Sequence, residues 1–251
     1  MINAHYKPDV VNMTLEICAN SVESARIAYE SGAQRVELCN NLNEGGTTPS
    51  YGQVALAVKL LKIKVFVLIR PRAGDFLYSD LEFDIMKQDI LMCKHLKCDG
   101  IVIGLLQKDG QIDYERTKEL VSLAAPMEVT FHRAFDQCKD PEKAIEAIIQ
   151  TGCKRILTSG MKESVATGIE NIGRFIRQAN GRIIIMPGRG VKASNINEIR
   201  ERTGAMEFHT SAKKTQGSSM TFQFPGMKTT ELEWMQSDAN EIKRILRELQ
   251  K

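Results

Sequence analysis

The sequence has no excess of charge of one sign and no long apolar run. Its 34 basic and 31 acidic side chains leave a net charge of only +3. Because nucleic acids and anionic membranes attract strongly basic surfaces, the composition predicts neither kind of partner. No apolar stretch approaches the length that crosses a bilayer, and residues 1–12 lack the apolar segment of a signal peptide. We therefore expect a cytoplasmic protein with no nucleic-acid partner and no membrane partner.

The cysteines also lack a pattern that would indicate a disulfide framework. There are six of them, with no CxxC pair and no dense spacing, so reduced thiols are expected in the absence of an export signal. The segment Cys93–Cys98 has the composition of a metal-binding turn, but positions five apart diverge on a helix, and we interpret it as structural. Free thiols still leave the binding of a soft metal open.

No Pro- or Ser-rich linker divides the chain, and we predict a single domain over residues 1–251. Eight short apolar runs are predicted as buried strands: Leu15–Ala19, Arg35–Asn40, Lys64–Arg70, Gly100–Leu105, Glu128–Ala134, Arg155–Ser159, Arg182–Pro187 and Glu207–Ser211. Eight amphipathic stretches are predicted as helices: Val22–Ser31, Tyr51–Leu61, Leu81–His95, Tyr114–Ala125, Glu142–Thr151, Ile169–Ala179, Asn195–Thr203 and Glu231–Leu249.

Helix start signals support these boundaries. Asn20 with Glu23 and Ser79 with Glu82 have capping-box spacing, and Thr48–Pro49 and Asp140–Pro141 place proline where a helix begins. Strict alternation of strand and helix favours a parallel sheet, and eight strands are the number that closes a barrel. A doubly wound sheet usually carries a glycine fingerprint after its first strand, which is missing here. The predicted fold is therefore a single (β/α)₈ TIM barrel of the α/β class.

Polar residues late in apolar strands are the candidate catalytic and metal-binding residues, because the carboxyl ends of barrel strands carry the chemistry. Seven residues meet this description: Glu16, Cys18, Glu37, Cys39, Arg70, His132 and His209. Glu16 and Cys18 lie two apart on one strand face, as do Glu37 and Cys39 on the next strand. A purely structural alternative pairs the two glutamates with Arg70 and closes the top of the core.

The loops that follow these strands suggest a site for a small anion. Candidate anion-binding residues are Arg72, Asp75, Ser159, Gly188 and Arg189. Two guanidiniums beside a flexible glycine suit a carboxylate or phosphate, and many barrels bind phosphate after strand seven. No lysine lies inside a strand near its carboxyl end; Lys213 and Lys214 come just beyond the eighth. The sequence therefore lacks the nucleophile of Schiff-base chemistry, and it has no serine elbow.

Several long motifs resemble the signature of the copper homeostasis protein CutC family. They run in one order from about Leu15 to Lys213: Leu15–Cys18, Arg35–Asn40, Glu44–Ser50, Ile69–Tyr78, Thr130–Asp136, Arg155–Gly160 and Glu207–Ala212. The resemblance implies a cytoplasmic barrel that forms a homodimer or higher homo-oligomer, and copper(I) binding at Cys18 and Cys39. The chain departs from the family at Arg189, where relatives commonly carry glycine, and at Thr210, where some carry cysteine.

Two hypotheses follow. The first is a CutC-type barrel that binds Cu(I) through Cys18 and Cys39 and acts in copper homeostasis. The alternative is an enzyme of isomerase, epimerase or lyase type, in which Arg70 and Arg72 hold a small anionic metabolite. His132, His209 or a glutamate would then move protons, and a divalent metal on carboxylates and imidazoles is compatible with it. A copper carrier needs two thiols but not a mouth lined with charge, so both hypotheses stay open.

Overall fold

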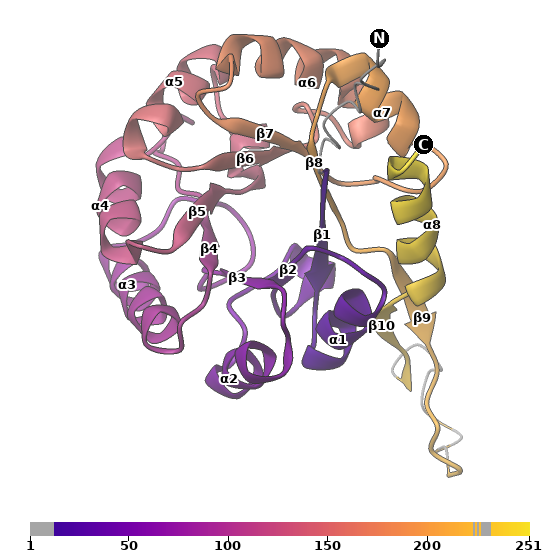
Figure 1. Cartoon of the computed structure of the whole chain (residues 1–251). Helices are drawn as coiled ribbons and strands as arrows, with labels where there is room; N and C mark the ends of the chain where they lie inside the picture. The colour runs from indigo at the N-terminus through magenta and orange to yellow at the C-terminus, as the bar shows by residue number, and fades with distance from the viewer. Residues whose placement is uncertain (1–12, 223, 225, 227–231) are drawn as a thin grey trace, which may run out of the picture.

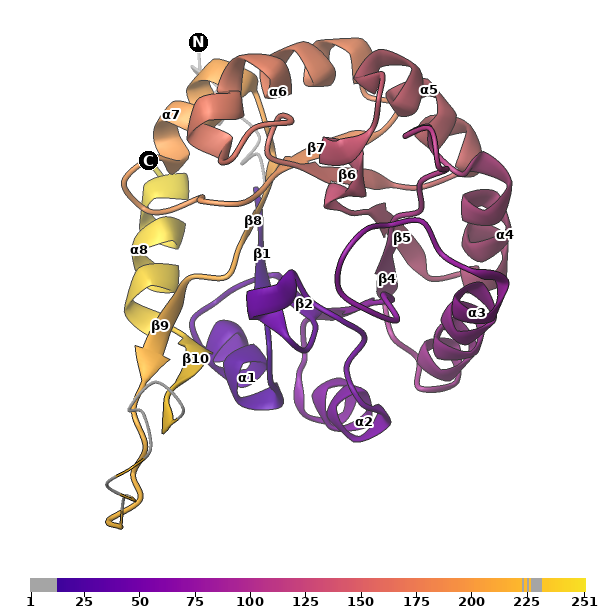
Figure 2. The same ribbon diagram turned by 180° about the vertical axis from the view of Figure 1, so that it is seen from behind.

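The computed structural model describes residues 13–222, 224, 226 and 232–251. Eight parallel strands form a ring, and helices cover its outer face (Figures 1 and 2). The ring strands are β1 Thr14–Ala19, β2 Arg35–Leu38, β3 Lys64–Leu68, β4 Gly100–Ile103, β5 Glu128–Phe131, β6 Arg155–Thr158, β7 Ile184–Pro187 and β8 Glu207–Thr210. The helices are α1 Val22–Glu30, α2 Tyr51–Leu60, α3 Asp80–His95, α4 Tyr114–Ala124, α5 Pro141–Thr151, α6 Val165–Ala179, α7 Ile196–Thr203 and α8 Ala239–Leu249. The predicted (β/α)₈ fold is confirmed.

The strands pair in sequence order, with β1 between β2 and β8. Hydrogen-bonded pairs connect the strands in the order β7-β6-β5-β4-β3-β2-β1-β8. Among the described residues, β7 and β8 are the neighbouring strands of the ring that form no such pair. The predicted strands run up to three residues too far at their carboxyl ends. Arg70 and His132 therefore lie just after β3 and β5, in the loops at the barrel mouth.

Side chains alternate between the two faces of each strand. On β1, Leu15 and Ile17 are fully buried in the large apolar cluster that also includes the helices. Glu16 and Cys18 face the other way, into the barrel, and Cys18 packs with Phe66 of β3. This alternation is the period of two that strands impose. It places the predicted charged residues inside the barrel.

Buried ion pairs fill the interior of the barrel near the amino ends of its strands. Arg35 contacts the carboxylate of Glu16 and lies 2.5 Å from that of Glu207. Arg155 binds the same Glu207 carboxylate at 3.0 Å and Glu128 at 2.7 Å. Charges of alternating sign therefore link five strands, and each of these charges has a partner, which burial in a low-dielectric interior requires.

The C-terminal prediction is wrong in part. Trp234–Ser237 form a strand, β10, which pairs antiparallel with β9 (Lys213–Gln216). The helix α8 begins only at Ala239, because the Asp238 side chain caps it by accepting from the amide of Asn240. Residue 231 lies outside the described residues. Ile242, Ile245 and Leu249 pack on the barrel as expected.

The predicted starts of α1 at Val22 and of α2 at Tyr51 are confirmed, but the start signals are correct only in part. Ser79 with Glu82 forms the predicted capping box, and Asp140–Pro141 starts α5 as expected. Ser21 rather than Asn20 caps α1. Ser50 caps α2, so Pro49 precedes the cap and does not occupy the first helical position. The helix α6 begins at Val165, four residues early.

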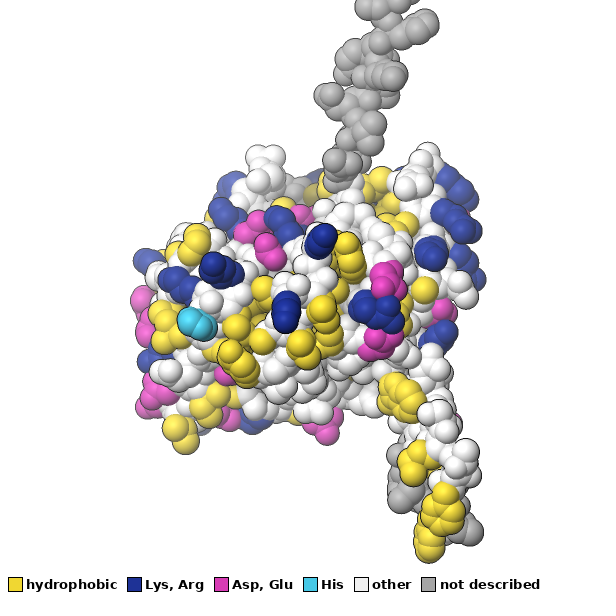
Figure 3. Space-filling view, turned by 60° about the horizontal axis from the view of Figure 1, so that its bottom comes forward, with side chains coloured by type: hydrophobic (Ala, Val, Ile, Leu, Met, Phe, Trp, Pro, Cys, Tyr) yellow, Lys and Arg dark blue, Asp and Glu magenta, His cyan; other side chains and the backbone are white. Residues whose placement is uncertain are grey.

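The outer surface carries charged side chains interspersed with apolar ones (Figure 3). Apolar side chains also extend along the segment that follows β9 and projects from the barrel (Figure 3). In this segment Met220, Phe222 and Phe224 are exposed. Among the described helices, none combines the length and the apolar character needed to cross a membrane.

Replacing Glu16 with Gln is expected to destabilise the protein by about 3 kcal/mol or more, because Arg35 would lose a partner while staying buried. Urea unfolding measures the effect. The matched control is Glu198→Gln, which breaks an exposed pair with Arg202 and should cost less than about 1 kcal/mol. Equal losses in the two variants would show that the buried pair does not control stability.

Candidate functional site

A cavity of about 920 Å³ opens at the carboxyl ends of the strands. Six of the predicted site residues line it: Cys18, Glu37, Arg70, His132, Arg189 and His209. Glu16 and Cys39 do not line it and are fully buried. The cavity therefore brings together residues from β1, β2 and β8 and from the loops after β3, β5 and β7.

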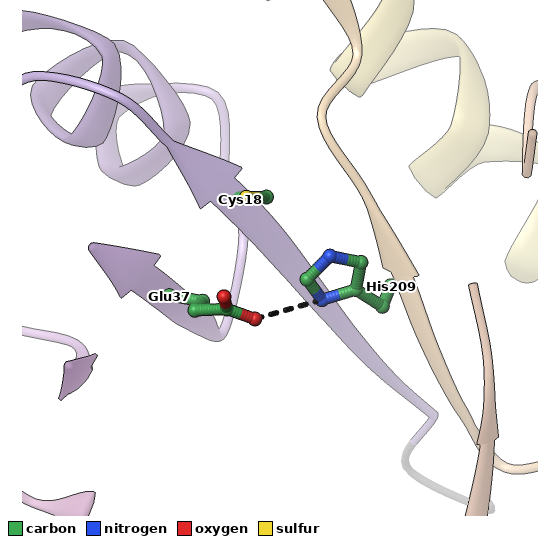
Figure 4. A group of neighbouring side chains, drawn as sticks. All are labelled: Cys18, Glu37 and His209. Carbon is green, nitrogen blue, oxygen red and sulfur yellow. Dashed lines mark ion pairs between the residues drawn. The ribbon is translucent and has the colours of Figure 1, made fainter. Parts of the chain in front are cut away.

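Cys18, Glu37 and His209 form a buried cluster on one wall (Figure 4). One potential ligand atom from each lies within 4.8 Å of the other two. The sulfur of Cys39 lies 3.6 Å from that of Cys18, so the two predicted thiols are neighbours. The wall therefore offers two sulfurs, an imidazole and a carboxylate as metal ligands, a set that suits a soft metal ion.

The imidazole of His209 joins this cluster to the ion pairs below. Its Nδ1 lies 2.7 Å from a carboxylate oxygen of Glu16 and 3.5 Å from one of Glu37. Burial lowers the pKa of His209, but the contacts with Cys18 and the two glutamates outweigh burial and raise it well above 6.5. The ring therefore carries a positive charge at neutral pH.

The two glutamates titrate in opposite directions. Burial raises the pKa of Glu16, but Arg35 and His209 overcome it and hold the value at about 2. Burial dominates at Glu37 and raises its pKa to about 7, although His209 opposes this. Glu37 thus has a pKa suited to taking up and releasing a proton near neutral pH.

The Cys18 thiol is protonated in the protein without metal. Its hydrogen bond with Cys39 and its burial raise the pKa well above 9. A metal ion at this position must therefore displace the thiol proton before it binds.

Arg70 is held by loop carbonyls, not by the glutamates. Its Nη1 donates to the carbonyl oxygens of Glu44 (3.2 Å) and Gly46 (2.7 Å), and its Nη2 to that of Gly74 (2.7 Å). The structural alternative, in which Arg70 pairs with Glu16 and Glu37, is therefore wrong. Glycine is needed at position 45, where φ is +86° and a Cβ atom would approach Arg70 Nη1 to 3.1 Å.

His132 is a neutral hydrogen-bond donor facing the same cavity. Its Nδ1 accepts from the amide of Ala134 at 3.1 Å, so the proton is on Nε2. Burial, helped by the charge of Arg70, lowers its pKa to about 3. The imidazole packs against Gly104, where a Cβ atom would lie 2.2 Å from Nδ1. Nε2 is buried and has no hydrogen-bond partner within the described part of the chain.

Four of the five predicted anion-binding residues do not line the cavity. Arg72 pairs with Asp75 at 2.9 Å and with Glu82 at 2.5 Å, and Ser159 binds Asp136 at 2.9 Å. Gly188 lies beneath the cavity, where its lack of a side chain makes room for Leu157 and His209. Of these five residues, Arg189 alone lines the cavity.

Sequence reasoning missed two kinds of residue. The first is the set of charged residues that open strands, chiefly Arg35 and Arg155. Both point inward, and their sequence signal is a charge at the first position of a strand that is otherwise apolar. The second is Arg133, which lines the cavity and pairs with Asp136 at 2.9 Å. Its signal is its place directly after His132.

Comparisons with known proteins point to one family. A model of the CutC family matches residues 13–214. A CutC family protein of Chromobacterium violaceum is 51% identical over 213 residues, 85% of this chain and 86% of that protein. A human protein named copper homeostasis protein cutC homolog is 49% identical over 83% of this chain and 77% of its own length. The crystal structure of a CutC protein from Streptococcus agalactiae covers 79% of this chain and 98% of its own, with a TM-score of 0.75 and 37% identity.

Replacing His132 with Gln is expected to make the fold less sensitive to acid. The unfolded chain protonates this histidine near pH 6.5 and the folded protein only near pH 3, so stability is complete above pH 6.5 and falls as the pH drops toward 3. Between pH 7 and pH 5 the variant should lose about 2 kcal/mol less than the parent. Urea unfolding at both pH values tests this. His95→Gln, on the exposed face of α3, is the control, and equal acid losses in the parent and His132→Gln would contradict it.

Proposed function

This chain belongs to the CutC family, and we propose that it acts in copper homeostasis by binding Cu(I) through Cys18 and Cys39. The names of relatives such as the human protein support the process. The observation that carries the ligand assignment is the 3.6 Å separation of the sulfurs of Cys18 in β1 and of Cys39, which directly follows the neighbouring strand β2. One ion can contact both with a small side-chain adjustment.

The donor chemistry of this wall favours Cu(I) over harder ions. Thiolates are soft ligands, and two of them adjacent in a buried, apolar setting suit a monovalent soft cation. Cys18 and Cys39 pack with Phe66, Leu68 and Val102 on the inner side of the barrel. Apart from Glu37 and His209, these surroundings are apolar and offer few oxygen ligands to a strongly hydrated divalent ion.

The charges beside the thiols are compatible with a bound thiolate pair. Cu(I) on two thiolates carries one net negative charge, and the protonated imidazole of His209 approaches Cys18 closely enough to lower its pKa. Binding replaces the Cys18 thiol proton with the metal, so protons leave as copper enters. His209 thus compensates the charge of the loaded site.

The double variant Cys18→Ser, Cys39→Ser is expected to bind Cu(I) more than about 100-fold more weakly, since loss of a second-shell partner alone costs 10–100-fold. Competition with a chromogenic Cu(I) chelator under anaerobic conditions measures the affinity. The matched control is Cys138→Ser, Cys153→Ser, two buried free thiols outside the cavity lining. The parent's affinity should also rise with pH by about tenfold per unit for each proton released. A double variant that binds as tightly as this control would overturn the ligand assignment.

A second candidate function, an enzyme of isomerase, epimerase or lyase type, is favoured by Glu37 and the cavity together. Its carboxyl group lines a cavity of about 920 Å³, far larger than one copper ion needs. With a pKa of about 7, the carboxylate is able to take a proton from a substrate carbon next to a carbonyl and return it to the product. The charged imidazole of His209 is placed to stabilise the carboxylate.

The enzyme function predicts hydrogen exchange into a substrate. In D₂O, the purified protein should introduce deuterium next to the carbonyl group of one member of a panel of small phosphorylated and carboxylated carbonyl compounds, as followed by proton NMR. Glu37→Gln should slow this exchange by about 100-fold or more, whereas Glu44→Gln, an exposed carboxyl at the cavity rim, should not. If no compound exchanges, or if Glu37→Gln exchanges at the parent rate, this function is excluded for that panel.

A further inference from the structure

Two buried N–H groups of the cavity residues have no hydrogen-bond partner among the residues that the structure describes: Nε of Arg70 and Nε2 of His132. Buried polar groups without partners are uncommon in folded proteins, because each costs free energy unless something satisfies it. Both side chains are more than nine-tenths buried, at 4% and 6% exposure, and both line the cavity. They lie near each other, since both side chains pack against the ring of Phe76.

A count of donors shows what Arg70 still offers. A guanidinium has five N–H groups, and three of them bind the carbonyl oxygens of Glu44, Gly46 and Gly74. The remaining two belong to Nε and Nη2, the pair that binds a carboxylate or phosphate side-on. The loop carbonyls therefore fix the position of the guanidinium and leave Nε unpaired among the described residues. The Tyr78 hydroxyl, also unpaired there, lies near enough for Arg70 to oppose the rise of its pKa.

The hydrogen bond from Ala134 fixes the tautomer of His132, which makes Nε2 a donor. A neutral imidazole in this tautomer presents an N–H to its ligand, and only an acceptor satisfies it. The ring of Phe76 contacts both groups, with its centroid 4.9 Å from that of His132 and 5.0 Å from the guanidinium carbon of Arg70. A bound acceptor must therefore sit beside this ring or displace it.

Further positive charge surrounds the cavity. Arg189 is exposed at the rim after β7, and Arg133 also lines the cavity, near enough for their charges to interact. Arg133 is paired with Asp136, so Arg189 is the better placed of the two to contact a ligand entering from solvent. Donors without acceptors and a positive rim together indicate an anionic ligand.

We propose that this cavity contains an oxyanion-binding site, made by Arg70, His132 and Arg189, for the phosphate or carboxylate group of a small metabolite. The site comes from the loops after β3, β5 and β7, whereas Cys18 and His209 lie in β1 and β8 and Cys39 directly follows β2. This anion-binding proposal does not depend on copper binding. It also names the substrate class that the second candidate function needs, and binding of an anion does not depend on turnover.

Calorimetric titration with inorganic phosphate, and separately with malonate, tests the site in the full-length protein. We expect saturable binding of at least one probe, and the preferred probe distinguishes a phosphate site from a carboxylate site. His132→Leu should weaken binding by about tenfold or more, the loss of one hydrogen bond to a charged group. His132→Gln keeps an N–H donor and should restore most of the affinity.

Arg189→Gln should also weaken binding severalfold, and because its side chain is exposed it should not disturb the fold. Arg202→Gln on α7 removes the same charge away from the cavity and is the matched control. The Cys18→Ser, Cys39→Ser protein should bind the anion as the parent does, which separates this site from the copper site. Absence of saturable binding, equal binding by Arg189→Gln and Arg202→Gln, or loss of binding in the cysteine variant would each overturn the proposal.

Discussion

The buried ion pair between Arg35 and Glu16 is the interaction on which the interior of this barrel depends. Both side chains are at most 3% exposed, and neither charge is tolerable there without the other. Arg35 also binds Glu207, which binds Arg155 in turn. Near the amino ends of the strands, the barrel is therefore filled by a connected set of charges in place of the branched aliphatic layers common in such barrels.

This arrangement determines the electrostatics of the site above it. Glu16 uses one carboxylate oxygen for Arg35 and the other for His209, so the imidazole is fixed and charged. Glu37 lies farther from the same ring atom, at 3.5 Å, and one of its oxygens has no hydrogen-bond partner. The result is one permanently ionised glutamate and one that titrates near neutral pH. Such divergence of two carboxyl groups by their surroundings is typical of functional sites.

The sequence predicts the fold and one wall of the site because both depend on short-range patterns. Eight apolar runs in alternation with amphipathic stretches define the barrel, and a spacing of two residues places Glu16 with Cys18 on the inner face. The same reasoning applies to Cys18 and Cys39. Cys18 lies in β1 and Cys39 directly follows the adjacent strand β2, and their sulfurs lie 3.6 Å apart. The partners of Arg70 and Arg72 were not predictable in this way, because a loop conformation decides which guanidinium turns inward.

The C-terminal error has a similar cause. Residues 234–249 contain apolar positions at helical spacing, but the carboxylate of Asp238 caps a helix that begins after it, and β9 supplies backbone partners for residues 234–237. The long-range ion pairs of Arg35 and Arg155 were also missed. Their partners lie 19 to 172 residues away, and only the closed ring of strands brings them together.

The two proposed ligands would share one cavity, and their charges decide how they interact. A Cu(I) ion on two thiolates leaves a net negative charge on the wall formed by β1 and β2, and an oxyanion adds negative charge on the other side. Repulsion between them is reduced by the positive groups that lie between and around them, chiefly His209 and Arg70. Because Cys18 lies in β1 and Cys39 directly after β2, whereas Arg70 is held by loop carbonyls, neither ligand needs the other to form its site. The same barrel mouth thus provides a soft metal site on rigid strands and an anion site on loops, with the buried charges of Glu16 and Arg35 supporting the wall that carries the metal.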